Sequence, residues 1–106
     1  MSVNKVILLG YVGGDPEMRF PAPDQAVAYL SLATNERQGN SGVEITEWHY
    51  LVMSGNNARL AERYIRKGSR LYVEGRLRSR EYQDKFQITR RRTEVFVDFF
   101  EILGRQ

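Results

Sequence analysis

Arginine and aromatic residues are interleaved in the second half of the sequence, in a pattern that suits binding to a chain of phosphates and flat rings. Between Arg63 and Arg92 there are eleven Lys or Arg residues and three Asp or Glu residues, a local net charge of +8 in a chain whose net charge is +3. Thirteen of the sixteen basic residues are arginine. The guanidinium group of arginine donates two parallel hydrogen bonds to a phosphate and stacks on aromatic rings. The pattern favours an anionic polymer as partner, although a hydrated charged surface has the same composition.

Two segments with a period of two residues place these side chains on common faces. In Ile45–Met53, Trp48 and Tyr50 share a face. Along Arg70–Arg80 and just beyond, one face carries Tyr72, Arg76, Arg78, Arg80 and Tyr82. Every base has a ring face to stack and every phosphate attracts a cation, so this combination predicts binding to a single-stranded nucleic acid. The alternative is that Trp48 and Tyr72 are core residues and the arginines form a solvated face.

Residues that could perform catalysis are sparse. His49 is the only histidine, and a lone histidine on a strand is more often structural than catalytic. There is no cysteine, and the acidic residues occur singly, without the spacing of metal ligands. The glycine-rich stretch Gly10–Gly14 is followed by Asp15 and Pro16 instead of the Gly-Lys-Ser/Thr of a phosphate-binding loop. We therefore expect no enzyme, no cofactor and no metal, with a hydrolase as the remaining enzymatic alternative.

Length and composition indicate one domain. The chain has 106 residues, which suits a single domain spanning 1–106 with a modest core. No apolar run reaches the length of a membrane span, and the N-terminal residues lack the layout of a secretory signal. We expect a cytoplasmic protein without membrane contact.

Short strands dominate the pattern, with one helix in the second half. A stripe of Leu60, Ala61, Tyr64 and Ile65 predicts the helix, with Asn56 or Asn57 as its N-cap and Gly68 at its C′ position. Asn35–Gly42 is polar and predicts a hairpin loop. Glu17–Phe20 could extend the first strand after a bulge. The predicted strands are Val3–Val12, Ala26–Thr34, Ile45–Met53, Arg70–Arg80 and Val95–Leu103.

This order of elements indicates a fold class. Three strands, a helix and two strands predict an all-β, five-stranded OB-fold barrel with one α-helix between strands 3 and 4. An SH3-like barrel or another small α+β sheet has a similar order, and the pattern alone leaves these open.

Several segments together resemble bacterial single-stranded DNA-binding proteins over nearly the whole chain. These segments are Val3–Gly10, Gly14–Glu17, Leu32–Thr34, Thr46–His49, Tyr64–Ser69, Leu71–Arg80 and Thr93–Val95. The resemblance implies an OB-fold subunit, usually of a homotetramer and alternatively of a dimer. It also implies protection of single-stranded DNA during replication, recombination and repair, on the bacterial nucleoid. Two alternatives are a tail-less accessory protein like the primosomal replication protein N family, which bridges proteins on DNA, and an RNA-binding OB module.

The resemblance assigns roles to individual residues. It implies that Trp48 stacks on bases and that Tyr82 stands where the family commonly has a stacking tryptophan. It places His49 at a subunit interface. Tyr50 and Tyr72 are further stacking candidates from their strand faces. The residues expected to contact phosphates are Lys5, Arg19, Arg66, Lys67, Arg76, Arg78, Arg80 and Arg90.

The sequence departs from the family pattern at several places. Ser54 stands where many members have a stacking aromatic, for which Tyr50 could compensate. The loop Asn35–Glu44 has no aromatic residue, and the hairpin Gln83–Ile88 lacks the usual turn glycine while Arg90, Arg91 and Arg92 add charge beyond it. The family normally continues into an acidic tip that recruits partners, whereas this sequence ends at Gln106. We therefore expect no tail-mediated protein recruitment by these residues.

Overall fold

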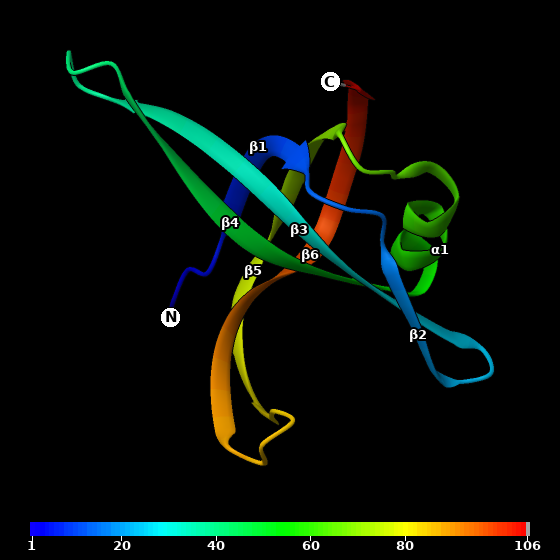
Figure 1. Cartoon of the computed structure of the whole chain (residues 1–106). Helices are drawn as coiled ribbons and strands as arrows, with labels where there is room; N and C mark the ends of the chain where they lie inside the picture. Colours follow the sequence, from blue (N-terminus) through cyan, green and yellow to red (C-terminus); the bar gives the residue numbers. More distant parts are fainter. Residues whose placement is uncertain (106) are drawn as a thin grey trace.

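Six strands and one helix make up the structure, a computed structural model that describes residues 1–105 (Figure 1). Apolar and polar residues alternate along the barrel part of the strands, as in sheets with one side on a core and the other in water. In chain order the elements are β1 (Val6–Val12), β2 (Glu17–Ala22), β3 (Gln25–Gln38), β4 (Val43–Ser54), α1 (Gly55–Tyr64), β5 (Ser69–Gln83) and β6 (Thr89–Arg105).

Five of these strands close into a barrel. β1 pairs with β5 on one side and with β3 on the other, so the order β1-β5-β6-β4-β3 returns to β1. β4 and β6 run parallel where Leu51 lies opposite Val95, and the other pairs are antiparallel. α1 lies between β4 and β5, which are the third and fourth strands of the barrel. The predicted all-β OB-fold with one helix is confirmed.

The first predicted strand begins later than expected, at Val6 instead of Val3, and its predicted extension is a separate strand. β1 ends at Val12, and the segment expected to extend it forms β2, which pairs with β3 through Glu17 opposite Tyr29. The N–H of Gly13 donates to the carbonyl of Ser31 at 3.0 Å before the chain leaves the barrel. Pro16 has no N–H to continue the ladder, so the chain turns here and β2 forms a hairpin with β3.

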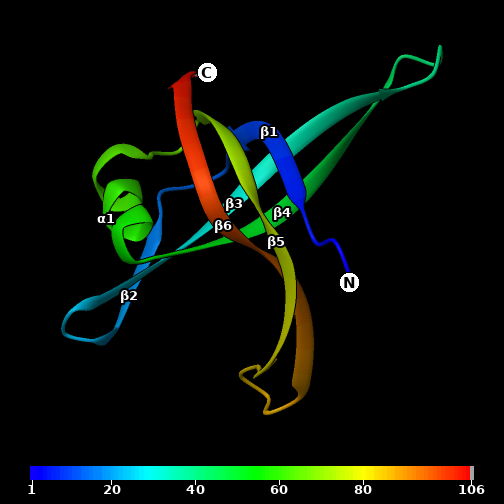
Figure 2. The same cartoon turned by 180° about the vertical axis from the view of Figure 1, so that it is seen from behind.

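The core fills the barrel and extends beneath the helix. Its largest fully buried apolar side chains are Leu32, Leu51, Met53, Ile65 and Leu71. Burying a side chain of this size stabilises the fold by about 1.5–3 kcal/mol. α1 covers one end of the barrel with Ala58 and Ala61, as Figures 1 and 2 show from opposite sides.

Two hairpins extend further than the sequence predicted. β3 runs to Gln38 and β4 begins at Val43, so half of the expected 35–42 loop is strand. β6 begins at Thr89 instead of Val95, which places the three arginines at 90–92 inside a strand. Both hairpins project beyond the barrel (Figures 1 and 2). Because both faces of a projecting hairpin meet water, its residues do not show the apolar alternation by which a strand is recognised.

The helix ends differ from the predicted caps. The N-cap is Ser54, which makes no side-chain cap hydrogen bond, and not Asn56 or Asn57. The C-cap is Ile65, so Gly68 does not occupy the C′ position. Gly68 instead has a φ of +87° in the following turn, where its N–H donates to the carbonyl of Val12 at 2.8 Å. That contact with β1 decides the position of the glycine, which helix capping rules do not consider. No helix within residues 1–105 is long and apolar enough to cross a membrane.

Candidate nucleic-acid interface

Strand register brings the predicted stacking residues of β4 beside a tyrosine of β3. On the outer face of this strand pair, Trp48 lies opposite Ala33, Tyr50 opposite Ser31 and Val52 opposite Tyr29. The small side chains of Ala33 and Ser31 leave the rings of Trp48 and Tyr50 standing above the sheet, 52 % and 44 % exposed. The outer face of β3 and β4 is therefore a surface with aromatic rings at regular spacing.

A chain of four hollows follows these rings across the molecule. The first, of about 340 Å³, lies between Lys67, Gly13 and Trp48, and the second between Trp48 and Tyr50. The third joins Tyr50 to Tyr29 and Arg92. The fourth, of about 360 Å³, is lined by Glu17, Arg19, Tyr29, Arg80, Tyr82, Gln83 and Arg92. Because neighbouring hollows share lining residues, they form one path, called here the aromatic groove.

Gly13 lets the ring of Trp48 lie against the backbone. A Cβ atom at this position would stand 2.6 Å from Cζ3 of Trp48 and 2.9 Å from its Cη2. Such distances are far inside van der Waals contact, so any side chain here would displace the indole ring. Trp48 is thus supported on one side by glycine backbone and remains half exposed, which suits a platform on which a base can stack.

Guanidinium groups lie over the tyrosines in the groove. Cζ of Arg92 is 4.4 Å from the ring centroid of Tyr50 and 5.5 Å from that of Tyr82. Cζ of Arg80 is 5.7 Å from the centroid of Tyr29 and 5.8 Å from that of Tyr82. These are distances of cation–π contacts. The groove therefore offers positive charge and aromatic surface at the same place.

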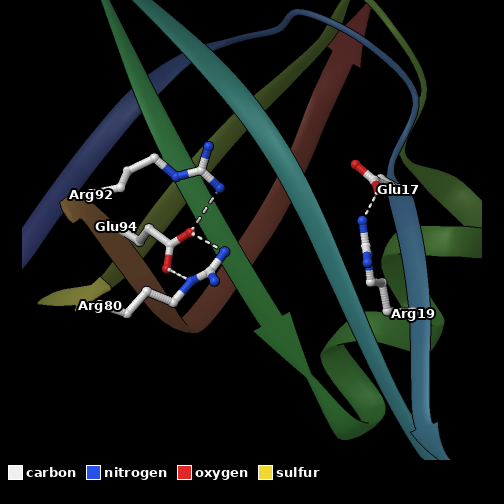
Figure 3. Close-up of polar contacts among 5 residues, drawn as sticks. All are labelled: Glu17, Arg19, Arg80, Arg92 and Glu94. Carbon is white, nitrogen blue, oxygen red and sulfur yellow. Dashed lines mark hydrogen bonds and ion pairs between the residues drawn. The ribbon is translucent and has the colours of Figure 1, made fainter. Parts of the chain in front are cut away.

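The two arginines converge on one buried carboxylate (Figure 3). Nε and Nη2 of Arg80 donate to Glu94 at 2.8 and 3.2 Å, and Nη2 of Arg92 donates to it at 3.2 Å. The side chain of Glu94 is 1 % exposed. Its hydrogen bonds to Arg80 raise the pKa of that guanidinium above its ordinary value. The separate Glu17–Arg19 pair lies on β2, at 2.7 Å.

Two of the predicted residues lie on a different surface. The hydroxyl of Tyr72 donates to Oε2 of Glu74 at 2.5 Å, and the Tyr72 ring meets Phe99 edge to face with centroids 6.3 Å apart. Lys5 pairs with the same Glu74 at 3.0 Å. The shared hydrogen bond raises the pKa of Tyr72 and lowers the pKa of Glu74. The structure therefore does not bring Tyr72 and Lys5 together with the residues of the aromatic groove.

The remaining predicted phosphate residues are distributed unevenly. Arg19, Lys67 and Arg80 line the groove. Arg76 pairs with Asp98 at 3.3 Å and Arg90 with Asp84 at 3.0 Å. Arg78 lies over the ring of Phe96, with Cζ 5.0 Å from the centroid. The guanidinium of Arg66 donates to the carbonyls of Glu62 and Ile65 at the end of α1. Many of these cations thus already have partners in the free protein.

Two residues of the groove, Tyr29 and Arg92, and the buried Glu94 that pairs with Arg80 and Arg92 are not predicted by the sequence. Tyr29 alternates with Ala28 and Leu30 on a predicted strand, but only the pairing of β3 with β4 shows that it faces Val52. From the sequence, Arg92 is only extra charge beyond a hairpin, and its contact with Tyr50 is not indicated. For Glu94 the sequence has no signal, since an acidic residue beside an arginine run predicts an exposed side chain.

His49 has a structural hydrogen bond. Its Nε2 is 2.9 Å from Oγ1 of Thr34, and its side chain is half-buried on β4. The predicted role at a subunit interface stays a prediction. Within residues 1–105, no group of three or more His, Asp or Glu side chains could hold a metal ion.

Two comparisons with known proteins agree with this geometry. A model of the single-strand binding protein family matches residues 3–103. The chain is also 44% identical over 109 residues to a single-stranded DNA-binding protein of Bacteroides thetaiotaomicron, an alignment that covers 98% of this chain and 68% of that relative. Since both matches span nearly the whole chain, it belongs to the single-strand binding protein family.

Proposed function

We propose that the aromatic groove is where this protein binds single-stranded DNA. Binding of single-stranded DNA, without catalysis, is the function of its family. One observation supports this location above others. Trp48, Tyr50, Tyr29 and Tyr82, which come from three strands, line one path together with Arg80 and Arg92.

The composition of the groove explains how binding can be independent of base sequence. Rings present their faces to the groove, and every base has a face that can stack on them. Arginine and lysine at the rim contact phosphates, which are the same at every nucleotide. We expect a strand to run from Lys67 past Trp48 and Tyr50 toward Arg80 and Tyr82. Through such binding the protein would protect DNA during replication, recombination and repair on the nucleoid in the cytoplasm.

The opposite surface supports self-association. Ile7 and Leu9 of β1 and Phe99 of β6 flank Tyr72 and Glu74 of β5, where Ile7 pairs with Glu74 and Glu74 with Phe99. Ile7, Leu9 and Phe99 are about half exposed. These five residues are called here the apolar face. Exposed apolar side chains gathered around a paired carboxylate suit an interaction surface, and we propose that a second copy covers it in a homotetramer, or alternatively in a dimer.

Fluorescence of the single tryptophan tests the location of the DNA. Trp48 is the only tryptophan, so its emission reports on one place in the groove. A thymine oligonucleotide should quench it, because the ring would stack on a base. Unchanged emission in a sample where anisotropy of the labelled oligonucleotide shows full binding would place the DNA elsewhere. Competition between matched DNA and RNA oligonucleotides distinguishes the RNA-binding alternative.

A further inference from the structure

A buried carboxylate paired with two arginines of the groove is unexpected beside a site for a polyanion. Glu94 is 1 % exposed, so its charge is removed from water, and it also opposes the phosphates that the groove would receive. Burying a charge is costly unless it is paired and hydrogen-bonded. The three hydrogen bonds from Arg80 and Arg92 satisfy that requirement. They also use positive charge that could otherwise bind phosphate, since two guanidinium groups and one carboxylate leave a net charge of +1.

The arrangement fixes each guanidinium in two directions. Glu94 holds Arg80 by its Nε and Nη2 edge and Arg92 by its Nη2. The tyrosines contact the arginines from other sides: Tyr50 lies 4.4 Å from Cζ of Arg92, and Tyr82 lies within 6 Å of both. A guanidinium has five N–H donors, so each arginine keeps donors that Glu94 does not use. Both arginines line the groove.

We propose that Glu94 is a positioning residue, which lowers the positive charge of the groove in order to hold Arg80 and Arg92 in place against Tyr50 and Tyr82. This inference rests on the proposed function, because it assumes that DNA occupies the groove. Long arginine side chains lose rotational freedom on binding. When Glu94 has already ordered them, the DNA does not bear that cost, so affinity depends on the carboxylate even though its charge repels the ligand.

Glu94→Gln separates this inference from simple electrostatics, because the two give opposite results. If charge alone mattered, removing a carboxylate would tighten binding and steepen its dependence on salt. If positioning matters, the freed arginines lose their orientation, and we expect about tenfold weaker binding of a labelled thymine oligonucleotide, since charged hydrogen bonds are broken. The slope of log affinity against log salt should become shallower by about 0.7 for each phosphate that the arginines no longer bind.

Three variants serve as controls for Glu94→Gln. Glu17→Gln removes a carboxylate that lines the groove, is exposed and pairs with Arg19, and it should tighten binding. Val95→Ala weakens the core next to Glu94 and should lower the unfolding temperature without changing affinity or salt slope. Glu94→Asp keeps the charge on a shorter side chain, and its affinity should lie between those of the wild type and Glu94→Gln.

The results of these experiments either support or overturn the positioning role of Glu94. Equal or tighter binding by Glu94→Gln, with an unchanged or steeper salt slope, overturns the positioning role, as does an equal loss in Glu17→Gln. If Glu94→Gln does not fold, Glu94→Asp is compared with Val95→Ala, and equal affinities of those two overturn it. A change at Trp48 tests the groove itself: if Trp48→Leu leaves affinity unchanged, the proposed function fails, whatever Glu94 does.

Discussion

Tyr72 and Tyr82 lie on the same strand, ten residues apart in the sequence, and have opposite surroundings. Tyr82, in the aromatic groove, lies within 6 Å of the guanidinium carbons of Arg80 and Arg92. Tyr72, on the apolar face, contacts Phe99 and gives its hydroxyl hydrogen to Glu74. A ring covered by cations suits a polyanion. The carboxylate of Glu74 beside Tyr72 would repel one. We therefore propose that the same residue type serves DNA binding at one end of β5 and self-association at the other.

The largest expected effect is on assembly, and it tests the apolar face. Leu9→Asp places a charge among Ile7, Phe99 and Tyr72, and an uncompensated charge buried in an interface costs about 3–5 kcal/mol. The assembly should dissociate to monomers at micromolar concentration in sedimentation velocity. Val43→Asp, which changes an exposed apolar residue on the β3–β4 hairpin, should leave the assembly intact.

A different result would move the interface. A wild-type monomer at micromolar concentration contradicts the proposed assembly outright. His49→Lys tests the interface role that the family resemblance assigns to β4. If His49→Lys dissociates the protein while Leu9→Asp does not, subunits meet near the β4 strand and the apolar face has another use.

The next effect is on DNA affinity and compares the two aromatic surroundings directly. Trp48→Leu should weaken binding of a thymine oligonucleotide by about 1–3 kcal/mol, the usual contribution of a base-stacking ring. Tyr82→Leu should lose affinity in the same direction. Tyr72→Leu should leave affinity within error, because that ring lies outside the groove. Titrations by fluorescence anisotropy measure all three. A loss in Tyr72→Leu as large as that in Trp48→Leu would extend the DNA path over the apolar face.

These comparisons also show what the sequence could predict. The barrel strands and the helix follow from apolar periodicity, and the groove residues Trp48, Tyr50, Arg80 and Tyr82 follow from the alternation on β4 and β5. Alternation also predicted one common face for Tyr72 and Tyr82, because they are an even number of residues apart on the same strand. Over that length a strand twists, and the β5–β6 ladder shifts register at Glu74 and Gly75. For this reason the two tyrosines lie on different surfaces although their spacing along β5 is even.

The rest of the site depends on contacts between distant segments. Tyr29 enters the groove through the pairing of β3 with β4, and Arg92 through the unpredicted length of β6. Burial of Glu94 requires both Arg80 and Arg92 to reach it from two strands. No periodicity or motif in the sequence predicts these contacts, because each joins residues on different strands.

A smaller effect concerns the support of Trp48. Gly13→Ala puts a methyl group within 2.6 Å of the indole ring, so the ring must move and stack less well on a base. We expect a loss of about 1 kcal/mol in DNA affinity, at the low end of the range for a stacking ring, and weaker quenching of Trp48 on binding. Gly14→Ala is the matched control, since a Cβ there meets nothing within 4 Å. Equal affinities of the two variants would show that the position of the ring is unimportant.

The smallest effect is a pH dependence confined to the apolar face. The hydrogen bond from Tyr72 and the interaction with Lys5 lower the pKa of Glu74 below its ordinary 4.5 in the folded protein. A depressed carboxyl pKa stabilises the fold above the unfolded value, and the contribution is lost as pH falls through the folded pKa. Tyr72 has a pKa raised above 10.0, so its contribution is present below that value and is lost at higher pH. The pair should therefore stabilise the protein fully from about pH 5 to 9.

Tyr72→Phe isolates this pair because it keeps the ring against Phe99 and removes only the hydroxyl. The difference in unfolding temperature between wild type and Tyr72→Phe should be constant near neutral pH and shrink as the pH falls below 4.5. It should be small, since Glu74 and Lys5 are partly exposed and water screens their interaction. The change should leave DNA affinity at neutral pH untouched, because the groove does not include Tyr72. A difference that persists unchanged to about pH 3 would show that the hydroxyl does not act through the Glu74 carboxylate. The hydroxyl of Tyr72 would then stabilise the apolar face by packing alone.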